Sequence, residues 1–211
     1  MVKLYYFDVY GPVESIRMLL HKAGVQFEDH RLNRDQVNEL KTQGVLEFGQ
    51  VPMLELDDGT KLTQTKAIFR YLARVHKFEA ENDMDYYRGE SMYSHFAEDL
   101  QERAMYKVFF MPEGEEKVKA KAQLFEKTFP EFFERVDSWV AGKKYLLGDK
   151  LTLYDFAIGG FFHNMVLNAG NPDAAQWAPI WEKAGENLKK YVATMEAEFK
   201  DYLESRPKCS F

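Results

Sequence analysis

The sequence predicts an α/β domain at residues 1–78 followed by an all-helical domain at residues 84–211. Two observations predict this division. Short apolar runs alternate with helical stripes in the first part, whereas the second part shows helical periodicity almost throughout. Between them, His76–Asp83 is charged and has no apolar pattern, which is typical of a linker. We therefore place the domain boundary in that segment.

The first predicted strand carries the first candidate functional residue. Residues 3–7 alternate in character, so Leu4 and Tyr6 share one face. Gly11-Pro12 then breaks the chain, and proline suits the first turn of a helix. An apolar stripe that stops at Gly24 predicts this helix, with Val13, Ile16, Leu19, Leu20 and Ala23. A phenol beside a helix start can donate a hydrogen bond to a thiolate, although such a tyrosine is more commonly a half-buried strand aromatic.

Two strands, a hairpin turn and a helix complete the predicted α/β domain. Residues 26–32 predict a second strand, whose charges favour an edge position. Residues 33–46 are polar and aperiodic, which indicates a loop with a short helix around Val37–Lys41. Residues 53–56 and 61–62 predict a hairpin, because the intervening Asp-Gly supplies the positive φ of a type I′ turn. A helix follows the cap-like residues 63–65, with a stripe of Ala67, Ile68, Tyr71 and Leu72.

The order strand–helix–strand and then strand–strand–helix describes a thioredoxin-like layer. A redox enzyme of this shape carries a cysteine at the start of its first helix, where the helix dipole lowers the pKa of the thiol. Residues 8–12 contain no cysteine, and the only one in the chain is Cys209. We interpret Cys209 as a bystander. A thiol that takes part in the chemistry must therefore come from a ligand.

Apolar stripes predict the helices of the second domain, over residues 84–111, 118–140, 152–165 and 188–203. The first of these is long enough to be kinked, and Pro130 interrupts the second. Thr152 and Asp155 have the spacing of a helix cap. We prefer this role for Asp155 to that of a catalytic acid.

Composition and motifs argue against several functional classes. A net charge of −6 argues against a nucleic-acid partner or an anionic membrane surface. The five histidines lie far apart and match no metal-binding spacing, so no metal is expected. No phosphate-binding glycine motif is present, and no apolar run is long enough to span a membrane. We expect a soluble, cytoplasmic protein without an intrachain disulfide.

Six stretches of the chain resemble the cytosolic glutathione transferases: Lys3–Phe7, Glu28–Arg31, Phe48–Glu55, Gln64–Ile68, Gly148–Phe156 and Arg206–Lys208. The first, second and last are most similar to the sigma class, with the alpha, mu and pi classes as relatives. The resemblance covers essentially the whole chain. It implies a thioredoxin-like domain that binds glutathione, a helical domain that supplies most of the electrophile pocket, and a homodimer.

The resemblance also implies roles for individual residues. Tyr6 would stabilise the thiolate of glutathione, the co-substrate, and Lys41 would face its glycine carboxylate. Glu98, or Asp99 if the register slips by one, would reach into the partner subunit's site. The implied glutathione contacts are Tyr6, Lys41, Gln50, Val51, the cis-proline Pro52, Gln64, Thr65 and Glu98. Candidate walls of the electrophile pocket are Val9, Tyr10, Arg103, Tyr106 and Phe211.

The chain departs from the family pattern at three places. Pro12 stands where many relatives have arginine, Val37 stands where many have tryptophan, and the loop at residues 42–47 is slightly longer than in sigma relatives. These changes bear on the glycine end of glutathione and not on the thiolate contact. Phe48 lies where alpha-like relatives insert an aromatic key into the partner subunit.

Three functions follow from the resemblance. The first is conjugation of glutathione to small hydrophobic electrophiles, as in detoxification. The alternatives are a non-catalytic ligand-binding or structural protein and a sigma-type prostaglandin isomerase. A purely structural role requires none of Tyr6, Gln64 and Glu98, so their presence favours an enzyme.

Overall fold

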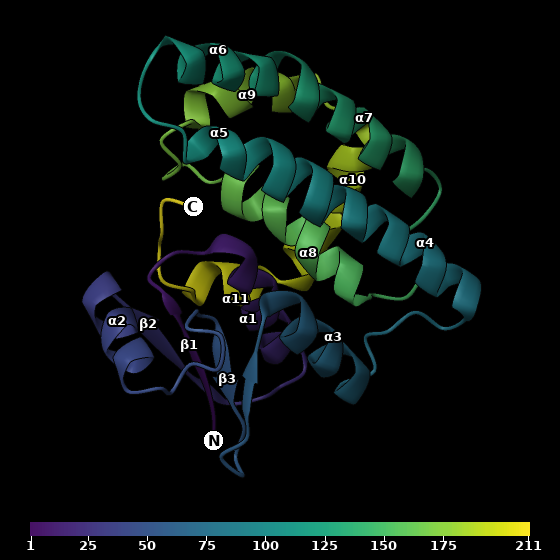
Figure 1. The fold of residues 1–211 in the computed structure, drawn as a ribbon. Coiled ribbons are helices and arrows are strands. Elements are labelled where there is room, and N and C mark those ends of the chain that lie inside the picture. The colour runs from purple at the N-terminus through teal and green to yellow at the C-terminus, as the bar shows by residue number, and fades with distance from the viewer.

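The computed structural model describes residues 1–211 and has a sheet-containing part below a stack of helices (Figure 1). Strand β1 (Val2–Phe7) pairs in parallel with β2 (Phe27–Leu32) and antiparallel with β3 (Met53–Glu55), which pairs with β4 (Lys61–Thr63). The strand order β2-β1-β3-β4 confirms the thioredoxin-like layer. It also places β2 at an edge, as its charged residues predict.

The helices of the sheet-containing part cover both faces of its strands. They are the 3₁₀ turn η1 (Gly11–Val13), α1 (Glu14–Lys22), α2 (Arg34–Thr42) and α3 (Thr65–Val75). Helix α2 is longer than the predicted short helix. Its start is fixed by a capping box, in which the Asn33 side chain accepts from the Gln36 backbone and the Gln36 side chain accepts from the Asn33 backbone. Capping of this kind supports a helix that has little apolar periodicity.

The β3–β4 hairpin forms where the Asp-Gly pair predicts it, but the prediction of a type I′ turn is wrong. Gly59 has φ +84°, whereas Asp58 does not have a positive φ. A type I′ turn needs positive φ at both central residues. The connection is longer instead, because the Leu56 N–H donates to the Thr60 carbonyl and the Gly59 N–H donates to the Leu56 carbonyl.

The helical part begins at residue 83 and contains π-helical segments within its long helices. Helix α4 (Asp83–Ser94) continues through η2 (His95–Tyr106) into α5 (Lys107–Phe109), and α6 (Glu115–Gln123) continues through η3 (Leu124–Thr128) into α7 (Phe129–Val140). Pro130 therefore does not break its helix. It lies at the second position of α7, after the π-helical segment η3, and the residues on either side of that junction keep helical backbone angles.

The remaining helices are α8 (Leu153–Phe161) with η4 (Phe162–Val166), α9 (Ala174–Glu182), α10 (Glu186–Glu198) and α11 (Lys200–Ser205). Helix α9 has no counterpart among the predicted helices, although its Trp177 is fully buried. None of the helices combines the length and the apolarity that crossing a bilayer would require.

Asp155 is the helix cap that its spacing predicts. Its carboxylate is fully buried and accepts hydrogen bonds from the Thr152 N–H and hydroxyl, both at 2.9 Å. It also accepts from the Leu146 N–H at 2.8 Å and the Tyr191 hydroxyl at 3.2 Å. These hydrogen-bond partners lie in the 141–152 loop and in α10. The Asp155 carboxylate therefore connects the loop and α10 with α8, which is a structural role.

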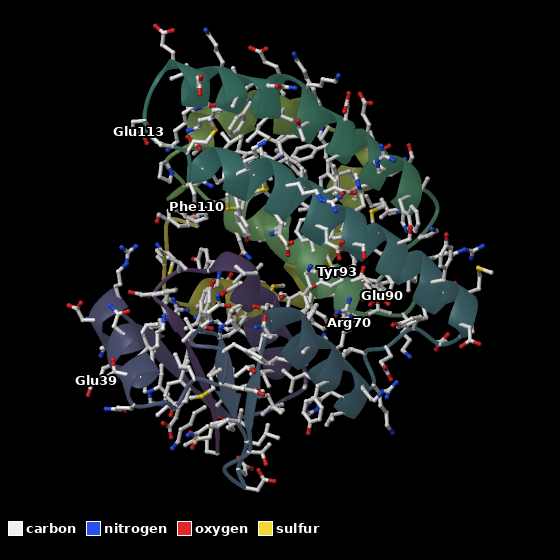
Figure 2. The ribbon with its side chains drawn as sticks, viewed as in Figure 1. Glu39, Arg70, Glu90, Tyr93, Phe110 and Glu113 are labelled. Atoms are coloured by element: carbon white, nitrogen blue, oxygen red, sulfur yellow. The ribbon has the colours of Figure 1, made fainter.

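One apolar core joins the two parts across the segment 76–82. This core contains Leu4 and Ile16 of the sheet-containing part and Phe156 and Met195 of the helical part. Polar contacts add to this joint. The Arg70 guanidinium of α3 donates two hydrogen bonds to the Glu90 carboxylate of α4, at 2.6 and 3.1 Å. The same guanidinium lies 5.5 Å from the Tyr93 ring centroid. Figure 2 shows these three side chains between the lower and upper parts.

Gly89 of α4 allows close packing of α4 against α8. A Cβ at this position would overlap the ring of Tyr154, which is fully buried. We expect Gly89→Ala to lower the free energy of unfolding by about 1–3 kcal/mol, because the ring or the helix must shift. Urea unfolding measures this. Ser91→Ala, at an exposed position of the same helix, should leave the midpoint nearly unchanged; equal midpoints for the two variants would contradict the packing argument.

Candidate active site

Tyr6 lies near the end of β1, with its hydroxyl beside Gly11. A Cβ on Gly11 would lie 3.3 Å from the hydroxyl oxygen, so the glycine leaves this oxygen uncovered. Gly11 also has φ +52°, a conformation that glycine adopts at little cost. The hydroxyl forms no hydrogen bond within the chain, and it is not among the buried polar atoms without a partner. It is therefore a free donor within reach of solvent.

The surroundings of Tyr6 keep the phenol protonated. Burial raises its pKa, and the nearby Arg17 guanidinium opposes this rise. A phenol with a raised pKa carries its proton at neutral pH and can donate a hydrogen bond to an anion. Tyr6 thus has the protonation state that a thiolate partner requires.

Arg17 also holds the loop that follows Tyr6. Its guanidinium is almost fully buried and donates to the carbonyls of Val9 at 2.9 Å and Tyr10 at 3.3 Å. It forms ion pairs with Glu14 at 3.1 Å and Asp29 at 3.0 Å. The loop next to the phenol is therefore anchored to α1 and β2.

The N-terminus of α3 provides an exposed group of backbone donors. Gln64, just before the helix, has φ +70°, which is uncommon for a residue other than glycine. Its carbonyl accepts from the N–H groups of Ala67 and Ile68, which leaves the first two N–H groups of the helix without a partner. Free N–H groups at a helix N-terminus favour a bound carboxylate. A strained backbone of this kind is commonly found at functional sites.

The segment before β3 has an unpaired backbone. The Val51–Pro52 bond is cis, as the resemblance implies. The N–H and C=O of Val51 take part in no backbone hydrogen bond, and Val51 is half-buried beside the exposed Gln50. The stem of Lys41 lies against Gly49, where a Cβ would be 3.2 Å from Lys41 Cε. Lys41 therefore lies against the residue that precedes Gln50, and an extended peptide could pair with Val51.

The two acidic candidates on η2 face different partners. Glu98 lies 3.6 Å from the ammonium of Lys66, in the first turn of α3. Asp99 is bound instead by Arg103 at 2.6 Å and His95 at 3.2 Å. These partners lower the pKa of Asp99 and keep it ionised. Within one chain, Glu98 is thus the residue of the pair that faces the N-terminus of α3.

A cavity of about 340 Å³ opens beside Gly11, between η1, α1, the helical part and the C-terminal tail. Of the five candidate wall residues, Tyr106 and Phe211 line it, but Val9, Tyr10 and Arg103 do not. Tyr10 is buried with the Arg206 guanidinium 4.0 Å from its ring centroid, and Arg103 is three-quarters exposed.

The sequence-based reasoning missed most of the cavity wall. The missed apolar residues include Tyr93, Phe96, Met105, Phe109, Phe110, Phe156, Phe161 and Met165. The aromatic-rich end of the 84–111 helix was a signal for part of this wall. The residues of α8 and η4 carry no comparable signal, because their apolar side chains also fit an ordinary core.

Comparisons with known proteins agree along the whole chain. Residues 2–74 match the family model "Glutathione S-transferase, N-terminal domain", and residues 98–206 match "Glutathione S-transferase, C-terminal domain". The chain is 39% identical to mouse glutathione S-transferase A3 over 74% of this chain and 70% of the relative. It is 30% identical to the probable glutathione S-transferase 5 of Caenorhabditis elegans, over 99% of this chain and 98% of the relative.

Two solved structures have a similar fold. Prostaglandin synthase D of Nilaparvata lugens has a TM-score of 0.82 at 27% identity, covering 98% of both chains. The sigma class transferase of Fasciola hepatica has a TM-score of 0.80 at 29% identity, covering 100% of this chain and 98% of the other.

Proposed function

The chain belongs to the glutathione S-transferase family and is a glutathione transferase, and on this premise we propose that Tyr6 holds the sulfur of glutathione as a thiolate. The observation that carries this proposal is the uncovered, unpaired Tyr6 hydroxyl beside the cavity. A free thiol has a pKa of about 8.5, so less than about a tenth is thiolate at neutral pH. A hydrogen bond to the anion lowers that pKa.

The thiolate is the nucleophile of the reaction. It attacks an electrophilic carbon held in the cavity, and a carbon–sulfur bond forms. With an aromatic halide the halide leaves with its bonding pair, and with an enone the pair passes to the carbonyl oxygen and the enolate takes a proton from water. The cavity contributes by holding the electrophile close to the sulfur.

The proposed glutathione contacts are made by hydrogen-bond donors and acceptors of the sheet-containing part that have no partner within the chain. The backbone of Val51 pairs with the cysteinyl unit beside Gln50 and Pro52, and Lys41 faces the glycine carboxylate. Gln64 and Thr65 hold the γ-glutamyl carboxylate at the N-terminus of α3. The unpaired backbone groups at Val51 and at α3 support this assignment.

The electrophile is small and hydrophobic in this proposal, in keeping with a cavity wall that is largely aromatic. We place the chain nearest the sigma class, which the likeness to the Fasciola hepatica structure supports. Prostaglandin isomerisation is the second candidate, because another similar structure is titled prostaglandin synthase D. Conjugation of a chlorodinitrobenzene, assayed beside isomerisation of a prostaglandin endoperoxide, tests both. Absence of both reactions would favour a non-catalytic ligand-binding role.

We also propose a homodimer formed through α3 and α4. Tyr71 and Tyr86 line the same groove between these helices and are 42% and 50% exposed. Met84 and Tyr87 on α4 and Phe48 before β3 are also exposed. Exposed apolar side chains gathered in this way are typical of an interaction surface. In the dimer, Glu98 would reach the γ-glutamyl amine in the partner subunit's site.

The dimer proposal predicts that Tyr86→Ser combined with Tyr87→Ser shifts the protein towards the monomer. The substitutions remove apolar area from the proposed interface and add polar groups that must be desolvated. Light scattering coupled to size-exclusion chromatography measures the mass. Val118→Ser, at an equally exposed site on α6, is the control. An unchanged mass for the double variant would exclude this face.

A further inference from the structure

His163 on η4 is a buried titratable residue that the proposed chemistry does not use. It is 8% exposed, and its Nε2 atom has no hydrogen-bond partner. Burial and the nearby Arg206 guanidinium lower the pKa of His163 from 6.5 to about 4, whereas the Val192 backbone acts in the opposite direction. The ring is therefore neutral at pH 7. A charged ring carries N–H groups on both nitrogens, so its Nε2–H would be buried beside a cation without an acceptor.

The neighbouring elements offer a charged His163 ring no counter-charge. Their buried titratable residues, on α1, α8, α10 and α11, are Glu14, Arg17, Tyr154, Asp155, Tyr191 and Tyr202. Both carboxylates in this set already accept hydrogen bonds from several other groups. Helix α9 adds only Glu182, which is exposed. Arg206 is thus the one charged group that acts on the pKa of His163.

Arg206 holds the end of the chain against the element that carries His163. Its Nη1 atom donates to Glu14 Oε1 at 2.7 Å and to Asn164 Oδ1 at 2.6 Å, and its Nη2 atom donates to the His163 carbonyl at 3.3 Å. Figure 1 shows the chain running from α11 up to the helical part, where Phe211 lines the cavity. The position of this cavity wall therefore depends on Arg206.

The tail, residues 206–211, has few other anchors. The Asn168 side chain donates to the carbonyls of Cys209 at 3.0 Å and Ser210 at 3.2 Å, and the Tyr10 N–H donates to the Phe211 carbonyl at 2.7 Å. No residue from 203 to 211 is fully buried. A segment with so little buried apolar area opens at a lower free energy than the core.

We propose that His163 is a proton-sensitive latch for the tail, whose ring takes up a proton at mildly acidic pH and so releases Arg206 and the Phe211 wall of the cavity. The open form exposes the ring to water and binds the proton more tightly than the closed form does. The closed tail is therefore fully stabilised above pH 6.5 and loses stability as the pH falls from 6.5 towards 4.

Hydrogen exchange measured by mass spectrometry tests the latch. The N–H groups of Leu203 and Arg206 are bonded within α11, so their exchange, corrected for the chemical exchange rate, reports opening of this segment. We expect the opening constant to rise roughly twentyfold from pH 7 to pH 5, because the open and closed forms differ in proton affinity over that range. His163→Leu should lose most of this pH dependence, since leucine does not titrate.

Three comparisons make the test specific. His163→Gln is polar but does not titrate, so it should behave like His163→Leu and serves in its place if the leucine variant does not fold. His76→Gln, at the C-terminal end of α3, should keep the pH dependence of the unsubstituted chain. Exchange in the buried part of α7 should not follow the tail. An unchanged pH dependence in the His163 variants, or equal responses of the tail and α7, would overturn the inference. The tail is followed without turnover, so a failure of the proposed function would not affect this result.

Discussion

Tyr6→Phe is expected to lower the rate of glutathione conjugation roughly ten- to hundredfold while leaving glutathione binding nearly intact. A hydrogen bond to a charged group contributes about 1.5–3 kcal/mol, which corresponds to about one to two pKa units of the bound thiol. Loss of the Tyr6 hydroxyl should raise that pKa and reduce the thiolate fraction at neutral pH. The contacts proposed at Val51, Gln64 and Lys41 do not involve the phenol, so binding should persist.

Two measurements distinguish this effect from general damage. The ultraviolet absorbance of the bound thiolate, followed against pH, should shift to higher pH in Tyr6→Phe. The activity lost at neutral pH should then recover in part as the pH rises. Tyr5→Phe is the matched control, because Tyr5 lies on the opposite face of β1 and stacks on His30 at 4.6 Å between ring centroids. Similar losses in the two variants, or an unshifted titration, would remove Tyr6 from the mechanism.

The fold could be predicted from local signals because those signals are strong in this chain. The Asp-Gly turn and the charges of residues 28–31 predict the hairpin and the edge strand, and Thr152 with Asp155 predicts the start of α8. Each of these features depends on residues that are close in sequence. The prediction missed α9, because the burial of that helix depends on contacts with residues far away in the sequence. Trp177 becomes core only because Phe125 and Phe129 pack against it at 4.8 and 4.3 Å between ring centroids.

The same distinction bears on the candidate site residues. Tyr6, Gln64 and Val51 lie at element ends, where a motif fixes the backbone, and the structure leaves each with an unpaired group. Arg103 is a different case, because its ion pair with Asp99, four residues earlier on the same helix, is a local signal that the assignment to the pocket did not use. Tyr10 is covered by Arg206, nearly two hundred residues later in the chain. Contacts over such a distance have no local signature.

A buried network around Glu14 connects α1 with the C-terminal end of the chain. The Glu14 carboxylate is fully buried and accepts from the Tyr202 hydroxyl and the Arg206 guanidinium, both at 2.7 Å, and from Arg17 at 3.1 Å. Arg206 has no other carboxylate partner, whereas Arg17 also pairs with Asp29. Glu14 is therefore the anion that offsets the buried charge of Arg206.

Glu14→Ala should lower the free energy of unfolding by about 3–5 kcal/mol, because it leaves a buried guanidinium without a counter-charge. For a chain of this size the thermal midpoint should fall by roughly 10 °C, which circular dichroism measures. Glu39→Ala, at an exposed position of α2, should change the midpoint little. Because Arg206 also binds Asn164 and the His163 carbonyl, the tail should loosen as well and be cleaved faster by a protease. A small midpoint change with unaltered cleavage would show that water replaces the carboxylate, and the network would then contribute little to stability.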